Sequence, residues 1–195
     1  MKITRRIVLL FAIISLLISL SVINETYAKY ANSVSGQTNI NVARWHILVN
    51  NQDIKNNSST SQILTPTFTG TEHIAENVIA PTSEGYIDII IDSSNVDVSF
   101  SYSITPNVSE NSAVSDFLVT GYTLNNGELT ELNNNESISN NIYKTDNIAT
   151  TSIRLFVKWN DDENASMNNE ADTNASLTDG QAKMKVTINF TQIAN

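Results

Sequence analysis

The chain has 195 residues, no cysteine and a formal net charge of −9, and 41% of its residues are hydrophobic. Without cysteine it can form no disulfide, no zinc site with sulfur ligands and no lipid attachment through an N-terminal cysteine. The negative charge argues against nucleic-acid binding, which needs a positive surface to displace counterions from phosphate.

The first 28 residues have the pattern of a secretory signal peptide. Three basic residues within 1–6 precede an apolar run over 7–23, and small residues lead to a cleavage position between Ala28 and Lys29. Cleavage removes three positive charges and one negative charge, so we expect a single secreted domain, 29–195, with a net charge of −11. The alternative is a retained leader that contacts the membrane, because the apolar run is close to the minimum length for crossing a bilayer.

Cleavage would leave residues 29–42 as a free amino-terminal segment without proline. Its backbone could add as an extra strand to an open sheet edge of another copy, and head-to-tail addition of this kind gives filaments. Pairing of the segment within its own subunit is the alternative. The apolar residues predicted to form this assembly strand are Tyr30, Val34, Ile40 and Val42.

Alternation of apolar and polar residues with a period of two dominates the rest of the chain, as expected for strands with one buried face. The alternating segments are 43–49, 86–92, 96–105, 152–159 and 183–191. The residues predicted to be buried are Phe100, Tyr102, Val157, Trp159, Val186 and Ile188.

Stretches rich in Asn, Ser and Gly separate these segments and are predicted to be loops, because Asn and Ser bond their own backbone and Asn tolerates left-handed turns. These stretches are 50–61, 93–95, 124–129 and 132–137, and a short helix is expected over 109–118. The pattern predicts an all-β fold, a jelly-roll-like antiparallel sandwich of two sheets with short helical or loop insertions, preceded by an N-terminal signal helix.

Catalytic motifs are nearly absent from the sequence. His46 and His73 do not form the H-E-x-x-H pattern of zinc peptidases, no serine lies in a G-x-S-x-G elbow, and the glycines are scattered singly. We therefore predict no enzyme activity and no cofactor.

The segment from Trp159 to Gln181 contains six acidic residues and no Lys or Arg. It does not fit an EF-hand that starts at Asn160, because Ala165 and Ala171 stand where Gly and Glu are required. We interpret it as a solvated connecting loop in which Asp172 and Thr173 serve local turn geometry. A looser cation site with oxygen ligands is the alternative, and its candidates are Asp161, Asp162, Glu163 and Asp172.

Three segments together resemble secreted bacterial proteins of the TasA and camelysin family. They are 26–50, 78–105, and a region that begins at Trp159 with an acidic linker and closes near Gln192. The resemblance implies a jelly-roll sandwich, export by a dedicated signal peptidase, and a role in extracellular matrix or fibres. Camelysin-like members are described as metallopeptidases, but this chain has no zinc motif and we do not carry that activity over. Thr82 stands where many relatives have Gly.

These observations lead to one preferred function and two alternatives. The preferred function is a secreted structural protein of the bacterial extracellular matrix or cell surface, with copies that associate into fibres or contact cell-surface components. The first alternative is a surface enzyme of the metallopeptidase-like or calcium-dependent kind. The second is a sandwich that binds carbohydrate or another surface, because one fold hosts many functions.

Overall fold

A computed structural model describes residues 5, 7–8, 10–20, 42–54, 58–162, 167–177 and 180–193. Contacts within the chain divide it into two units, Met1–Val42 and Ala43–Asn195. In the first unit residues 10–20 are helical, where the sequence predicts a signal helix. No helix in the described part of the chain is long and apolar enough to cross a membrane.

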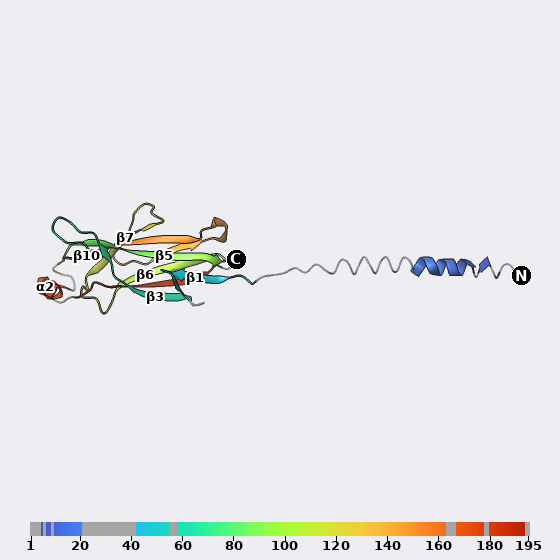
Figure 1. The fold of residues 1–195 in the computed structure, drawn as a ribbon, viewed down its shortest axis with the longest axis horizontal. Helices are drawn as coiled ribbons and strands as arrows, with labels where there is room; N and C mark the ends of the chain where they lie inside the picture. The colour runs from blue at the N-terminus through green and yellow to red at the C-terminus, as the bar shows by residue number, and fades with distance from the viewer. Residues whose placement is uncertain are drawn as a thin grey trace. The chain divides into compact units, whose positions relative to one another are not determined.

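The second unit consists of two antiparallel sheets packed face to face (Figure 1). The larger sheet has the order β2-β1-β5-β10-β7-β8, with β4 also paired to β5, and the smaller sheet has the order β3-β11-β6-β9. The strands are β1 (Trp45–Val49), β2 (Gln52–Asp53), β3 (Ser59–Leu64), β4 (Thr67–Phe68), β5 (Glu84–Val96), β6 (Phe100–Val108), β7 (Phe117–Leu124), β8 (Thr130–Glu131), β9 (Ile138–Ile142), β10 (Thr150–Trp159) and β11 (Met184–Gln192). This confirms the predicted all-β sandwich, and the chain crosses repeatedly between the sheets as it does in jelly rolls.

The core lies between the sheets and is built from the alternating residues. All six residues predicted to be buried are at most 3% exposed. An aromatic pair joins the two layers, because Trp45 of β1 lies edge-on to Phe100 of β6 with ring centroids 5.9 Å apart. Within the smaller sheet, the Phe100 ring centroid is 6.2 Å from that of Phe190 of β11. The predicted strands at 43–49, 86–92, 152–159 and 183–191 overlap β1, β5, β10 and β11. β5 also continues through 93–95, where the predicted loop was wrong, and a bend at 97–99 divides the alternating segment 96–105 between β5 and β6.

The helix predicted over 109–118 was wrong. This stretch is a turn that leads into β7, because Ser112 bonds the backbone locally: its Oγ donates to Val114 O at 2.7 Å and accepts from the N–H of Lys183 at 3.0 Å. Serine side chains that bond the backbone in this way compete with helix formation.

The loop predicted over 159–181 was also wrong in part, because it contains helix α2 (Asn169–Leu177). Asn168 provides the cap, since its Oδ1 accepts a hydrogen bond from the N–H of Ala171 at 3.0 Å. Glu170 and Asp172 in the first turn are favourable to the helix dipole. The predicted loop over 50–61 likewise contains β2 and the start of β3.

Asparagine occupies most of the left-handed backbone positions among the described residues, and apart from Asn77 and Asn147 these asparagines lie in stretches predicted to be loops. The residues with positive φ other than glycine are Asn50, Asn51, Asn77, Asn125, Asn126, Asn134, Asn135, Asn147 and Thr82. Thr82 is the exception, because a β-branched side chain is strained in this conformation. Its φ of 71° explains why Gly would suit this position.

Thr82→Gly is expected to stabilise the domain by about 1 kcal/mol, because left-handed strain of about 1–2 kcal/mol is relieved and part of the gain is offset by glycine's chain entropy. The turn itself is retained, since Ser83 N–H donates to Ala80 O at 2.9 Å and Pro81 precedes Thr82. Urea denaturation would measure the change, with Thr82→Ala as the control that keeps a Cβ. A less stable glycine variant would show that the Thr82 side chain makes a compensating contact.

Candidate functional site

The predicted cleavage and assembly residues fall mostly outside the described part of the chain. The residues outside the described part are Ala28, Lys29, Tyr30, Val34 and Ile40. The cleavage site and the assembly strand therefore stay predictions. Val42 is described and is 92% exposed.

The acidic region forms a pocket of about 420 Å³ beside α2. Asn169, Asp172 and Thr173 line it from one face of the helix, because residues three and four apart lie on the same side. Asp161 lines it from the stretch after β10, and the remaining walls are Ile79, Ala80, Pro81 and Trp159. The fold thus brings Asp161 and Asp172 to one pocket, whereas Asp162 is not among its lining residues and Glu163 lies outside the described residues.

Sequence reasoning missed Asp116, which is buried close to this pocket. Its Oδ2 accepts a hydrogen bond from the N–H of Met167 at 2.6 Å, which ties the chain entering α2 to the start of β7. Its backbone oxygen accepts from the N–H of Asn160 at 2.9 Å. Nothing in the sequence around Asp116 indicates this role, because Met167 and Asn160 are distant along the chain and reach Asp116 only in the folded domain.

Asp172 is a second buried carboxylate of the region, with 9% of its surface exposed. Burial is the largest cause that raises the pKa of Asp172, and the negative charges of Asp161 and Asp116 raise this pKa further. The indole N–H of Trp159 lowers the pKa of Asp172, but Trp159 Nε1 and Asp172 Oδ1 are both buried without a hydrogen-bond partner of ordinary geometry. The carboxylate is therefore held in a place that disfavours its charge.

Asp172→Asn is expected to raise the melting temperature at pH 7 in the presence of a chelator. Because the folded-state pKa is raised, the stability linked to this group is fully present below the ordinary pKa of 3.8 and is lost as the pH rises through the folded-state value. The gain from the variant should therefore shrink as the pH falls toward 3.8. Thermal unfolding across this pH range is the measurement, with the exposed Glu110→Gln as control. An Asn variant that is less stable at pH 7 would contradict the account of Asp172.

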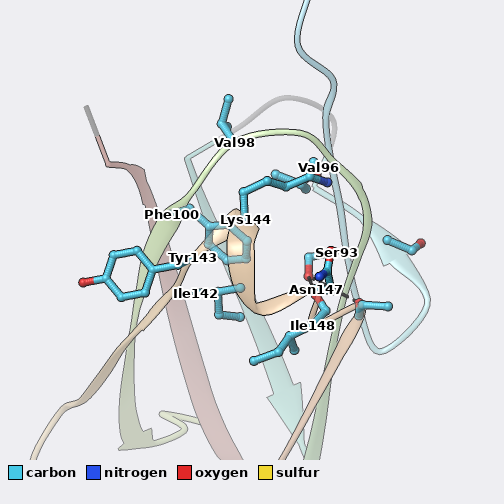
Figure 2. A pocket seen from close by; sticks show the side chains of 11 residues that line it. Ser93, Val96, Val98, Phe100, Ile142, Tyr143, Lys144, Asn147 and Ile148 are labelled. Carbon is cyan, nitrogen blue, oxygen red and sulfur yellow. Dashed lines mark hydrogen bonds between the residues drawn. The ribbon is translucent and has the colours of Figure 1, made fainter. Parts of the chain in front are cut away.

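At the opposite end of the sandwich, a second pocket of about 160 Å³ lies between the turn after β5 and the 3-10 helix η1 (Lys144–Asp146) (Figure 2). Figure 2 shows Lys144 reaching toward Val96, and its Nζ donates to Val96 O at 2.8 Å. Arg44, just before β1, binds both carboxylate oxygens of Asp97 at 2.9 Å and holds the pKa of Asp97 well below its usual range. The pocket is smaller than ordinary ligand sites, and these contacts fix the place where the chain enters the sandwich.

Among the described residues, neither tryptophan forms an open platform for sugar stacking. Trp159 is buried in the core, and Trp45 packs on Phe100. On the outer face of the larger sheet, the guanidinium of Arg154 lies 3.9 Å from the ring centroid of Tyr86 and is paired with Asp88 at 2.7 Å. One face of the Tyr86 ring is therefore already covered.

The smaller sheet has two open edges, β3 and β9, in the described part of the chain. β3 pairs with β11 along its whole length, Ser59 opposite Asn189 and Leu64 opposite Met184, and has no described strand on its other side. Its sequence STSQIL contains no charge and no proline, which are the usual features that protect an edge. Ile63 is 58% exposed on this strand.

Two features of the described chain are open to other molecules: an acidic pocket beside α2, and the edges β3 and β9, neither of which contains a charged residue or a proline. Among the described residues no three His, Cys, Asp or Glu side chains converge closely enough to hold a metal ion. Comparison with models of protein families gives no match, and comparison with curated proteins gives no significant match.

Proposed function

We propose that the chain is a secreted structural protein of the bacterial extracellular matrix or cell surface whose copies associate by strand addition. Residues 29–42 of one copy pair with the open edge of β3 in the next. The observation that carries this proposal is the six-residue edge of β3, which has neither charge nor proline and no described partner on its outer side. The resemblance of three segments to TasA and camelysin supports the same role.

Strand addition at β3 is favourable because the edge presents unpaired backbone groups. Alternate N–H and C=O groups of an edge strand point away from the sheet, and an added strand pairs them. At about 3.3 Å per residue, the fourteen residues of 29–42 extend to about 46 Å, against about 20 Å for β3. The segment is long enough to cover β3 and still leave a tether to β1.

The charge distribution permits this contact in spite of the overall charge. A net charge of −11 makes copies of the mature domain repel one another, and salt or acid weakens that repulsion. Residues 29–42 contain Lys29 and no acidic residue, and β3 has no charged residue at all. The contact itself therefore brings no like charges together.

The secretion part of the proposal predicts a mature protein that begins at Lys29. Amino-terminal sequencing of the protein recovered from the medium is the measurement. The expected result is a single sequence starting KYANS. Recovery of intact Met1 in the membrane fraction would contradict cleavage and support an anchored form.

The assembly part predicts that mature 29–195 forms filaments at high concentration and that deletion of Lys29–Gln37 leaves a folded monomer. Sedimentation and electron microscopy, at neutral and acid pH, measure the assembly, and thermal unfolding checks that the deletion does not damage the sandwich. Ile63→Lys provides a second block, because lysine on an edge strand opposes pairing. Ser139→Lys on β9, the other edge of the same sheet and likewise without charge or proline, distinguishes the two edges, because assembly that survives it and is lost in Ile63→Lys assigns the contact to β3.

A mature protein that stays monomeric under all these conditions would contradict the fibre role and favour a monomeric surface-binding role. Filaments formed equally well by the deletion variant would show that another segment makes the contact. Stoichiometric zinc together with chelator-sensitive cleavage of casein would instead support the surface-peptidase alternative.

A further inference from the structure

An apolar pocket of about 510 Å³ lies at the end of the smaller sheet where β3 ends. Thr65 and Pro66, which directly follow β3, form one of its walls. The apolar side chains that line it include Phe68, Val78, Val114 and Trp159. This volume lies within the range of about 300–1,000 Å³ that is usual for sites that bind organic groups. Val78 is 51% exposed here, so the pocket presents apolar surface to solvent that an aromatic side chain would cover.

The hydrogen bonds of β3 show which of its backbone groups are open to an added strand. Phe190 N–H donates to Ser58 O at 2.7 Å, and in antiparallel pairs the residues that bond the neighbouring strand alternate along the chain. Every second residue from Ser58 onward therefore bonds β11. The backbone groups that point away from β11 belong to Ser59, Ser61 and Ile63.

The side chains of β3 show which face of an added strand would lie toward the core. Gln62 faces the larger sheet, because its Nε2 donates to Val49 O of β1 at 3.0 Å. Residues 29–42 carry their large apolar side chains at even-numbered positions, which share one face of an extended strand. Pairing that turns this face inward sets even-numbered residues opposite Gln62 and its core-facing neighbours, and a shift by one residue would expose them.

We propose that the side chain of Tyr30 fills this pocket when residues 29–42 add antiparallel to β3, with Val34 opposite Gln62 and Tyr30 opposite Pro66. This inference rests on the strand addition proposed above and specifies its direction, its register and its anchor. Every strand pair in the described part of the chain is antiparallel, and this direction places the free amino terminus at the pocket end of β3. Among the registers that keep the apolar face inward, this one sets Tyr30 just beyond the strand, at the pocket wall.

The pocket suits a tyrosine at both ends of its side chain. The apolar walls cover the ring, and Asn77 and Gln181 also line the pocket and carry amides that can bond the hydroxyl. Burial of one large apolar side chain strengthens binding by about 10–100-fold. Residues 38–42 then form a tether of about 16 Å between the added strand and the domain that donates it.

The critical concentration for filament assembly of mature 29–195 is the first test. Tyr30→Ala and Val78→Lys are each expected to raise it by about tenfold or more, whereas Tyr30→Phe should keep it near the wild-type value because the ring remains. Leu129→Lys is the matched control, since Leu129 is a similarly exposed apolar residue that does not line this pocket. The double variant of Tyr30→Ala and Val78→Lys should lose no more than the larger single effect, because both changes remove the same contact.

Disulfide cross-linking in filaments is the second test, and it is unambiguous because the chain has no cysteine of its own. Mature protein with Ala31→Cys and Thr65→Cys should form covalent dimers and longer chains on mild oxidation, since the proposed register sets these residues opposite each other. Protein with Ala31→Cys and Ser59→Cys should not. Cross-linking of the second pair in place of the first would overturn the direction, and filaments indifferent to Tyr30→Ala would overturn the anchor while leaving strand addition intact. A mature protein that forms no filaments would overturn both.

Discussion

Val186→Asp is expected to leave the domain unfolded at 25 °C, whereas Asn189→Asp on the same strand is expected to fold normally. Val186 is 1% exposed and lies on β11 between Gln62 of β3 and Pro106 of β6. An unpaired carboxylate at this place costs several kcal/mol, which is comparable with the total stability of about 5–15 kcal/mol of a domain. Asn189 is exposed on the other face, so its variant adds the same charge without burial.

Circular dichroism and thermal unfolding of the two variants would measure this difference. The pair also tests the register of β11, because a shift by one residue would exchange the two faces of the strand. A soluble Val186→Asp protein that unfolds cooperatively with unchanged stability would show that the opposite face of β11 is buried.

Phe100→Ala is expected to destabilise the domain by about 3–5 kcal/mol, the usual cost of removing a buried aromatic ring. Phe100 is 1% exposed and contacts Trp45 of the larger sheet and Phe190 of its own sheet, so its loss opens a cavity between the layers. Urea denaturation measures the change, and Phe100→Leu is the control that fills part of the space. A loss below about 1 kcal/mol would show that the two sheets do not depend on this ring for their packing.

The sequence was sufficient to predict the strands in which apolar and polar residues alternate strongly. It was a weak guide to strands that form only because their backbone pairs with a neighbouring strand. β11 alternates apolar and polar residues from Met184 to Thr191, and β10 does so over most of 152–159, and their residues predicted to be buried are buried. The first half of β3 was assigned to a loop because Ser59, Thr60 and Ser61 carry no apolar signal. It is a strand because its backbone pairs with β11, a contact between residues at least 120 positions apart.

Helix α2 and the acidic pocket show a second limit of sequence reasoning. The helix is only nine residues long and has few apolar residues, so its amphipathic signal is weak, and its start depends on the cap of Asn168 and the bond between Met167 and Asp116. We named Asp161 and Asp172 among the cation candidates from the sequence. No pattern in the sequence predicts that these two residues line the same pocket. Asp116 was assigned to a helix that does not form, so its burial beside the pocket could not be foreseen.

Amide hydrogen exchange of β3 is the most direct test of strand addition. In mature 29–195, the amides of Ser59–Leu64 that face away from β11 are expected to exchange rapidly at low concentration and to become protected when filaments form. The amides of β11 should change little, because β3 and β6 already pair with both of its edges. Filaments in which β3 exchanges as fast as it does in the monomer would contradict addition at this edge.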